Sequence, residues 1–214
     1  MTSPEASICA IARHRMEIDG AGIRSLILFS DCPLRCRYCA NPYTWDGSRS
    51  AVSYSPESLL EKLSVDSVYF KATQGGITFG GGEPLLYTSF ISALIDLCPK
   101  EWNFIAETSL CVPWENVALI AHKTEKFIVD IKSMDDTIYH AYTGGRLSLA
   151  KENLISLSRL IGPDRITVRV PIIPNYADSR SQKESVEELK KLGITHFDEF
   201  SYVIKNKGMK YLSE

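Results

Sequence analysis

Hydrophobic and polar positions along this 214-residue chain follow two repeating patterns. Short apolar runs, such as Leu-Ile-Leu-Phe at 26–29 and Phe-Ile-Val at 127–129, are typical of buried strands. Longer segments carry apolar residues three or four positions apart, which indicates a helix with one buried face. We predict six strands and five helices in alternation. The strands are at 25–30, 76–79, 103–108, 126–132, 165–173 and 199–204, and the helices at 56–65, 88–97, 113–121, 148–161 and 182–192.

Strands that alternate with helices predict right-handed βαβ units around a parallel sheet, so the fold class is α/β. Residues that bind ligands in such sheets lie at the carboxyl ends of the strands. The chain is long enough for one domain with a sizeable core and too short for two ordinary ones, so we predict a single domain over residues 1–214.

Charge and hydropathy exclude several classes of function. The formal net charge of −2 gives no electrostatic footprint for nucleic acid or for an anionic membrane. The N-terminus has no basic segment followed by a long apolar one, and no apolar run approaches the roughly 20 residues that span a bilayer. Six cysteines are too few for a secreted disulfide scaffold of this length. We therefore expect a cytoplasmic protein.

Three cysteines lie together directly after the apolar run at 26–29: Cys32, Cys36 and Cys39, in a Cys-x3-Cys-x2-Cys pattern. Thiolates are soft ligands for zinc, Cu(I) or iron–sulfur clusters. A structural zinc site usually closes with four ligands in two pairs, whereas Cys98 and Cys111 are isolated and the four histidines are scattered. Three thiolates would leave one iron of a cluster open for a substrate or cofactor. A zinc site with a distant fourth ligand and a loop with incidental cysteines are the alternatives.

Seven short motifs, taken in order, resemble the radical S-adenosylmethionine (SAM) superfamily, and above all the activating enzymes of glycyl radical enzymes. They lie at 18–24, 32–46, 77–85, 107–109, 130–132, 142–144 and 169–175. The resemblance implies a partial (β/α)6 barrel with one [4Fe-4S] cluster. It also implies that SAM is cleaved reductively to a 5′-deoxyadenosyl radical, which abstracts a hydrogen atom from a glycine of a partner glycyl radical enzyme.

The same resemblance implies roles for individual residues. Cys32, Cys36 and Cys39 would ligate the cluster. The residues implied to contact SAM are Tyr38, Gly81, Gly82, Glu83, Ser109, Asp130, Lys132 and Arg169. Glu107, Thr108 and Asp130 match positions that help to bind a monovalent cation. Simple packing is the alternative for Tyr38, and rim salt bridges are the alternative for Lys132 and Arg169.

The chain departs from the family pattern at three places. Gly80 stands where the family usually has Ser, Glu107 replaces a shorter Asp, and Ser-Tyr-Val at 201–203 replaces Pro-Tyr-His. The cysteines outside the motif, Cys9, Cys98 and Cys111, are expected to be buried apolar residues.

Two other functions stay open at this point. One is a radical SAM enzyme that acts on a small molecule or short peptide, and the other is a non-enzymatic zinc or redox module. As an activating enzyme, the chain is expected to be a monomer that takes electrons from reduced flavodoxin or ferredoxin. Because the chain ends at Glu214, soon after the last predicted strand, we also expect a wide lateral cleft beside 80–83, lined partly by Tyr202 and Ile204.

Overall fold

The computed structural model describes residues 4–16 and 18–203. Its centre is an eight-stranded sheet with the strand order β3-β1-β2-β4-β5-β6-β7-β8. The strands are β1 (Ala6–Met16), β2 (Ile23–Phe29), β3 (Val52–Tyr54), β4 (Gly76–Gly81), β5 (Asn103–Thr108), β6 (Lys126–Asp130), β7 (Ile166–Ile172) and β8 (His196–Ser201). The α-helices are α1 (Pro56–Leu63), α2 (Ser67–Thr73), α3 (Thr88–Leu97), α4 (Trp114–Ile120), α5 (Asp136–Thr143), α6 (Leu147–Ile161) and α7 (Ser179–Lys191).

The six predicted strands correspond to β2 and β4–β8, which pair in parallel in chain order. The sheet has two further strands, because β1 pairs antiparallel with both β2 and β3. In the described part of the chain, the two edge strands β3 and β8 do not pair with each other. The sheet is therefore open, as expected for a partial barrel.

Besides β1 and β3, the predicted elements differ from the observed ones at the last strand and in two helices. The last strand was predicted at 199–204, but β8 begins three residues earlier, at His196. Ile204, which we expected beside the cleft, lies outside the described residues. Helices α2 and α5 are additional, and α5 is capped at its start by Asp135, whose Oδ1 accepts from the Ile138 amide at 2.9 Å.

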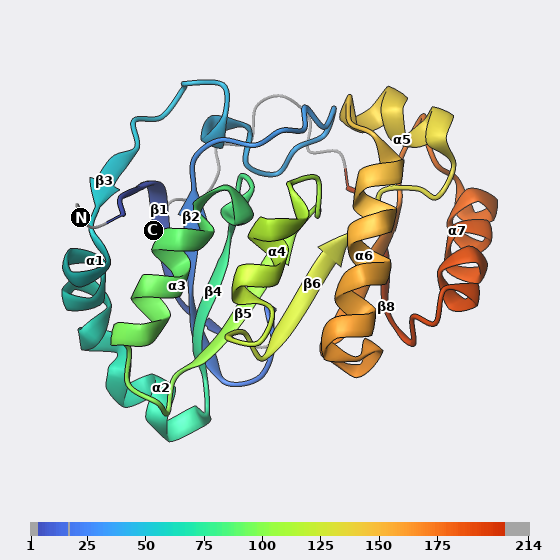
Figure 1. Ribbon diagram of the computed structural model, residues 1–214. Coiled ribbons are helices and arrows are strands. Elements are labelled where there is room, and N and C mark those ends of the chain that lie inside the picture. Colours follow the sequence, from blue (N-terminus) through green and yellow to red (C-terminus); the bar gives the residue numbers. More distant parts are fainter. Residues whose placement is uncertain (1–3, 17, 204–214) are drawn as a thin grey trace.

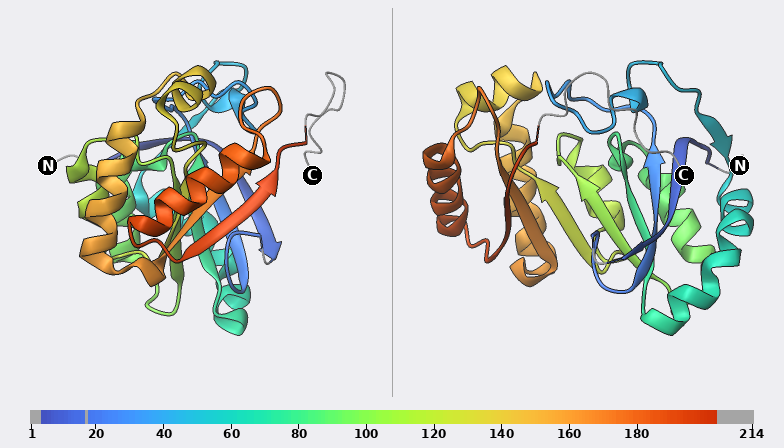
Figure 2. Two further views of the ribbon diagram at one scale, coloured as in Figure 1. Left: turned by 90° about the vertical axis from the view of Figure 1, so that its right-hand side faces the viewer. Right: turned by 180° about the vertical axis from the view of Figure 1, so that it is seen from behind.

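The two faces of the sheet differ in chemistry because side chains alternate along each strand. Ile27, Ala106 and Val168 lie on the helix-covered face of the sheet and belong to the main hydrophobic core. Helices such as α3, α4 and α6 cover this face (Figure 1). The intervening residues Glu107 and Arg169 line a cavity on the opposite face. Seen from behind, that face of the strands is not covered by helices (Figure 2, right).

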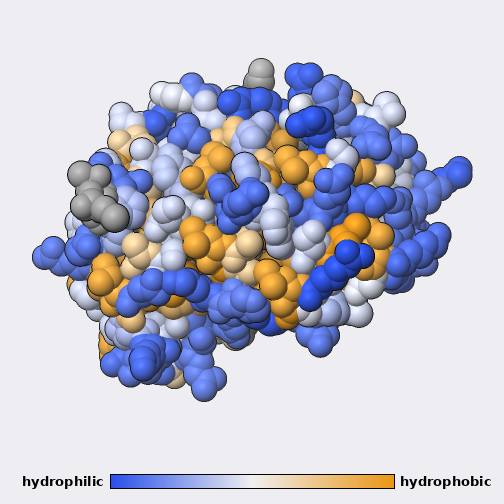
Figure 3. All heavy atoms as spheres, viewed as in Figure 1, coloured by the Kyte–Doolittle hydropathy of each residue, from blue (hydrophilic) through white to orange (hydrophobic). Residues whose placement is uncertain are grey.

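The helix-covered side of the molecule carries no continuous apolar area. Figure 3 shows its hydrophobic residues in separate patches among hydrophilic ones. Within residues 4–16 and 18–203, no helix is long and apolar enough to cross a membrane.

Candidate active site

The three motif cysteines lie on the loop that follows β2, and α5 holds this loop in place. The amides of Arg35 and Arg37 donate to the carbonyl oxygens of Thr143 and Tyr142, at 2.7 and 3.1 Å. Gly144 ends α5 with a left-handed φ of +71°. The motif at 142–144 therefore has a structural function, because its carbonyl groups brace the backbone on either side of Cys36.

The donor set of the loop, three cysteine thiols on one cavity, fits an iron–sulfur cluster. The side chains of Cys32, Cys36 and Cys39 line one cavity. Among the described residues, however, no three His, Cys, Asp or Glu side chains lie close enough together to hold one metal ion. Thiolates of a cluster bind different irons and stand further apart than ligands of one tetrahedral ion.

Burial keeps the free thiols protonated. It raises the pKa of Cys32 to about 12, and the nearby Glu83 acts in the same direction. Burial also raises the pKa of Cys36 to about 11. Such thiols become thiolates when a metal displaces the proton, so the loop is suited to hold a metal centre and is a poor free nucleophile.

Gly81 and Gly82 lie where β4 ends, and neither position accepts a side chain. Gly81 has φ +96°, and a Cβ there would lie 2.6 Å from the Leu28 Cα. A Cβ at Gly82 would collide with the carbonyl oxygen of Asp31. The Gly82 amide donates to the Phe29 carbonyl at 3.0 Å. The glycines thus let this turn lie directly against the start of the cysteine loop, with its backbone in the cavity lining.

Glu83 holds this turn to the end of β5 and is almost fully buried, with 1% of its surface exposed. Its Oε1 accepts from the Leu85 amide at 3.2 Å and from Thr108 Oγ1 at 2.7 Å. Its Oε2 accepts from the amide and the hydroxyl of Ser109, at 2.9 and 2.6 Å. Burial raises the pKa of Glu83, although the four hydrogen bonds act against that shift. The geometry makes Glu83 a brace beneath the cavity.

Lys132 is 8% exposed and lies in the cavity lining just beyond the end of β6. Its Nζ lies 2.9 Å from Asp130 Oδ1 and donates to Tyr202 Oη at 3.0 Å. Burial alone would lower the pKa of Lys132, but Asp130 and Tyr202 raise it above its ordinary value. The ammonium therefore stays charged and faces the cavity.

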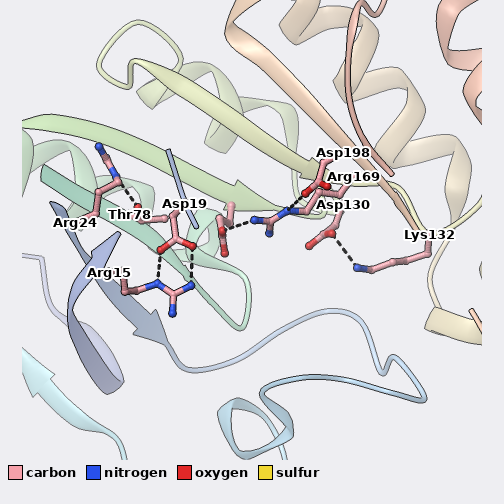
Figure 4. A network of polar contacts seen from close by, with 9 residues as sticks. Arg15, Asp19, Arg24, Thr78, Asp130, Lys132, Arg169 and Asp198 are labelled. Carbon is pink, nitrogen blue, oxygen red and sulfur yellow. Dashed lines mark hydrogen bonds and ion pairs between the residues drawn. The ribbon is translucent and has the colours of Figure 1, made fainter. Parts of the chain in front are cut away.

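Arg169 sits at the centre of a row of charges across three neighbouring strands. The register aligns Asp130 of β6 with Arg169 of β7 and Arg169 with Asp198 of β8. Arg169 Nη2 lies 3.0 Å from Glu107 Oε1, and its Nε lies 3.3 Å from Asp198 Oδ2. Figure 4 shows Arg169 beside Asp198, with the Asp130–Lys132 ion pair next to them. Both cations of the predicted SAM site are thus ion-paired and also line the cavity.

A cavity of about 660 Å³ unites most of the predicted site residues. Those in its lining are Cys32, Cys36, Cys39, Gly81, Gly82, Ser109, Asp130, Lys132 and Arg169. The other two, Tyr38 and Glu83, lie outside that lining. Tyr38 packs instead against the rings of Tyr142 and Tyr176, with centroids 6.1 and 6.0 Å apart.

Three charged groups in the cavity lining were given no site role from the sequence: Arg15, Asp19 and Asp198. Arg15 forms a two-point ion pair with Asp19, which is 1% exposed. Asp19 belongs to the motif at 18–24, so its position in that motif could have indicated a site role. Asp198 fell outside the predicted last strand, and a strand beginning at His196 would have aligned it with Arg169.

Outside the cysteine motif, Cys9 and Cys111 are buried as expected, at 7% and 8% exposure, and Cys98 is partly buried. Cys111 Sγ lies 3.1 Å from Tyr139 Oη.

Comparison with known proteins identifies the family to which this geometry belongs. The sequence profile of the radical SAM superfamily matches residues 26–198, from β2 to β8. This chain belongs to the radical SAM superfamily. The match covers the cysteine loop, the turn at Gly81 and Gly82, and the strand residues Asp130, Arg169 and Asp198.

Curated relatives refine the family. The pyruvate formate-lyase-activating enzyme of Clostridium pasteurianum is 34% identical over 173 residues, covering 80% of this chain and 70% of the relative. The (2S)-3-sulfopropanediol dehydratase activating enzyme of Klebsiella oxytoca is 28% identical, over 87% of this chain and 77% of the relative. Within the radical SAM superfamily, the chain thus belongs with activating enzymes, as its motifs predicted.

Solved structures support the fold. A domain of the pyruvate-formate lyase-activating enzyme from Bacteroides vulgatus superposes with a TM-score of 0.51 at 28% identity, covering 65% of this chain and 86% of that one. SuiB from Streptococcus suis, solved with S-adenosylmethionine, superposes with a TM-score of 0.61 at 16% identity, over 82% of this chain. The chain spans 39% of SuiB, so this likeness concerns the radical SAM fold alone.

Two departures from the radical SAM activating-enzyme pattern occupy the same space. A Cβ on Gly80 would lie 3.1 Å from Glu107 Oε2 and 3.0 Å from Leu26 Cδ1. The family usually has a larger residue at the first position and a shorter acid at the second. The loss of a side chain at Gly80 therefore makes room for the longer carboxylate of Glu107, which reaches Arg169.

Proposed function

We propose that this chain is an activating enzyme that generates a glycyl radical on a partner enzyme. The observation that carries the proposal is the shared cavity, which brings the cysteine loop, the glycine turn and the cations Lys132 and Arg169 to one place. These are the parts that a cluster and SAM require side by side. Arg15 pairs with Asp19, Asp130 with Lys132, and Glu107 and Asp198 with Arg169, so the site is neither strongly acidic nor strongly basic.

In this proposal Cys32, Cys36 and Cys39 hold a [4Fe-4S] cluster and leave its fourth iron to SAM. When bound, the cluster supplies the electron that splits SAM into methionine and a 5′-deoxyadenosyl radical, which takes a hydrogen atom from the partner's glycine. The cysteine loop is braced by α5 and by the glycine turn, so the protein fixes the cluster beside the SAM site.

SAM would bind along the strand ends that follow the cysteine loop. The backbone at Gly81 and Gly82 is free of side chains and faces the methionine end. Lys132 and Arg169 offer positive charge to the carboxylate and the ribose region, and Asp130 and Ser109 complete the contacts. Tyr38 lies beside the cavity near the adenine position, and Glu83 acts by ordering the glycine turn.

A monovalent cation beside SAM is part of the proposal. Glu107, Thr108 and Asp130 line the cavity and offer the oxygen ligands that such a cation needs. The two carboxylates are already paired with Arg169 and Lys132, so a cation would share them.

Protein substrates are supported by the relatives, which are named as activating enzymes of pyruvate formate-lyase and of sulfopropanediol dehydratase. Glycine suits this chemistry because no side chain blocks the approach to its Cα hydrogen. We propose that the chain acts as a single-domain monomer on such a partner, with reduced flavodoxin or ferredoxin as its electron donor.

The test begins with the cluster. Anaerobically reconstituted protein should bind about four irons and four sulfides, the content of one [4Fe-4S] cluster, and Cys36→Ala should lose SAM cleavage. Cys98→Ala is the matched control, because Cys98 lies outside the cavity lining. Retained cleavage by Cys36→Ala would refute the ligand assignment.

The substrate is tested by electron paramagnetic resonance after incubation with a candidate glycyl radical enzyme, SAM and a reductant. A glycyl radical doublet on the partner that requires this chain is the expected result. SAM cleavage without a radical on any candidate partner, together with turnover of a peptide or small molecule, would favour the other radical SAM function.

A further inference from the structure

Asp31, the residue directly before the first motif cysteine, has a left-handed backbone. Its φ is +61°, a region that residues other than glycine adopt rarely, although Asp tolerates it better than most. The left-handed residue follows the end of β2 at Phe29 and precedes Cys32, so the chain turns sharply where the cysteine loop begins. A non-glycine residue stays in such a conformation only when its surroundings hold it there, which makes it a candidate for a functional constraint.

The backbone of Asp31 closes the cysteine loop and joins it to the glycine turn. Its amide donates to the carbonyl oxygen of Thr44 at 2.7 Å, so the two ends of the loop that carries the three cysteines are tied together. Its carbonyl oxygen accepts from the Glu83 amide at 2.8 Å. One residue thus contacts both the loop assigned to the cluster and the turn assigned to SAM.

The side chain of Asp31 reaches a second point on the segment that follows the glycine turn. Its Oδ2 accepts from Tyr87 Oη at 2.7 Å and from Ser30 Oγ at 3.1 Å, and these two hydroxyl oxygens lie 3.0 Å apart. Tyr87 is the last residue of the short 3-10 helix at Pro84–Tyr87, and its ring centroid lies 5.4 Å from that of Phe29. Asp31 therefore holds this helix at both ends, through its carbonyl oxygen before the start and its carboxylate at the end.

These side-chain contacts lie at the surface rather than in the core. Asp31 is exposed and Tyr87 is partly buried. Removing the carboxylate therefore opens no cavity in the core, and surface substitutions usually change the free energy of unfolding little. The main effect expected of the Asp31 carboxylate is on where the loop and the turn lie relative to each other.

We propose that Asp31 is a positioning residue that fixes the cysteine loop at a set distance from the turn facing the methionine end of SAM. Asp31 is outside the cavity lining, so it acts through the two segments that it joins. Tyr87 is its partner, because the Tyr87 hydroxyl anchors the carboxylate to the segment after the turn. The inference rests on the proposed function, which assigns the cluster to the loop and SAM to the turn.

Three variants separate the side chain of Asp31 from its backbone. Asp31→Gly keeps the left-handed φ without strain and removes the carboxylate. Asp31→Asn tolerates the same φ and leaves an amide oxygen to accept from Tyr87. Tyr87→Phe keeps the ring and removes only the hydroxyl. Tyr69→Phe on α2, outside the cavity lining, is the matched control.

The first measurement uses anaerobically reconstituted proteins whose iron has been counted. The change that SAM causes in the electron paramagnetic resonance spectrum of the reduced cluster reports how SAM sits on the cluster. Asp31→Gly and Tyr87→Phe should keep their iron, give a weaker and broader SAM-induced change, and cleave saturating SAM about tenfold more slowly, which corresponds to about 1.4 kcal/mol. Asp31→Asn should recover most of the wild-type spectrum and rate. The double variant should be no slower than either single one, because both changes remove the same contact.

The second measurement needs no cluster. In hydrogen–deuterium exchange of the cluster-free proteins, the amides at 83–87 should exchange faster in Asp31→Gly and Tyr87→Phe, while α6 exchanges as in wild type. Asp31→Asn and Tyr69→Phe should match wild type throughout.

Unchanged exchange at 83–87, or a wild-type SAM-induced spectrum in both Asp31→Gly and Tyr87→Phe, would overturn the proposal. Faster exchange across the whole chain would also overturn it, since the contacts would then stabilise the fold as a whole. Losses that add in the double variant would refute the shared contact. Absence of iron from reconstituted wild type would instead refute the proposed function, and this inference with it.

Discussion

Glu83 offers a sharp test of whether the glycine turn is held by the protein or by its ligand. The change is Glu83→Gln, which keeps the shape of the side chain and replaces one carboxylate oxygen by an amide NH2. In wild type all four partners of the carboxylate are donors. If the glutamine NH2 takes the Oε2 position, the Ser109 amide loses its acceptor. If the NH2 takes the Oε1 position, the Leu85 amide loses its acceptor.

The expected loss follows from that count. A buried amide left without an acceptor costs about 1–3 kcal/mol, and the remaining bonds lose the strengthening that the negative charge gives. Removing the buried charge offsets part of this loss, because burial disfavours the ionised form. We expect the free energy of unfolding of the cluster-free protein to fall by about 2 kcal/mol.

Urea denaturation at pH 7, with equal slopes for both proteins, measures this change. Glu115→Gln on the exposed side of α4 is the matched control, and it should stay within about 0.5 kcal/mol of wild type. A similarly small change in Glu83→Gln, combined with weaker SAM binding, would contradict the bracing role. Glu83 would then be a direct ligand of the SAM ammonium, as the family resemblance implied.

Three further predictions concern the site. Lys132→Ala should weaken SAM binding to reconstituted protein roughly ten- to a hundredfold, measured by calorimetry, because it removes a charge-assisted contact of about 1.5–3 kcal/mol. The iron content of the variant should stay that of wild type. Unchanged affinity for SAM would leave Lys132 as a rim ion pair. Gly80→Ser should lower the free energy of unfolding less when it is combined with Glu107→Asp, because a Cβ at 80 would lie 3.1 Å from Glu107 Oε2. If the losses of the two single variants in urea denaturation simply add in the double variant, this coupling is refuted. The cluster-free protein should lose stability as the pH rises from about 9, because burial raises the pKa of Cys32 to about 12 and of Cys36 to about 11 from the usual 9.0 and so favours the neutral thiols in the folded state. This contribution is complete below pH 9 and is lost towards pH 11–12, and urea midpoints that stay level across that range would count against it.

The positions of the parallel strands could be predicted because apolar runs are local signals, whereas the partial-barrel arrangement was implied by the family resemblance. The antiparallel strand β1 was not predicted, since its sequence mixes Ala, Ser and Cys with charged residues. Register shifts between Ile8 and Ala10 and between Ala12 and Arg15 also interrupt its alternation. Its burial comes from pairing with β2 and β3, which is information that no short window contains.

The site residues that could be predicted are those with motif chemistry, such as the cysteines and Lys132. The Arg15–Asp19 pair depends on how the β1–β2 turn folds beside the cavity, and Asp198 depends on the register of β8. The function of Gly81 and Gly82 was predicted as ligand approach, whereas the structure adds contact with the cysteine loop. Such contacts between loops distant in sequence arise from the tertiary fold.

The alternation of side chains along the strands means that neighbouring residues are subject to different selection. On β2, Ile27 and Phe29 belong to the outer core, while Leu26 lies on the cavity side. On β7, Val168 and Val170 are likewise in the core, while Arg169 lies between them in the cavity. Mutations at the core positions of a strand would thus lower the cellular abundance of the protein. Mutations at the alternate, cavity-side positions would abolish turnover while the abundance stays normal. Along such a strand, the residues that set the chemistry of the site and those that form the core therefore occupy alternate positions.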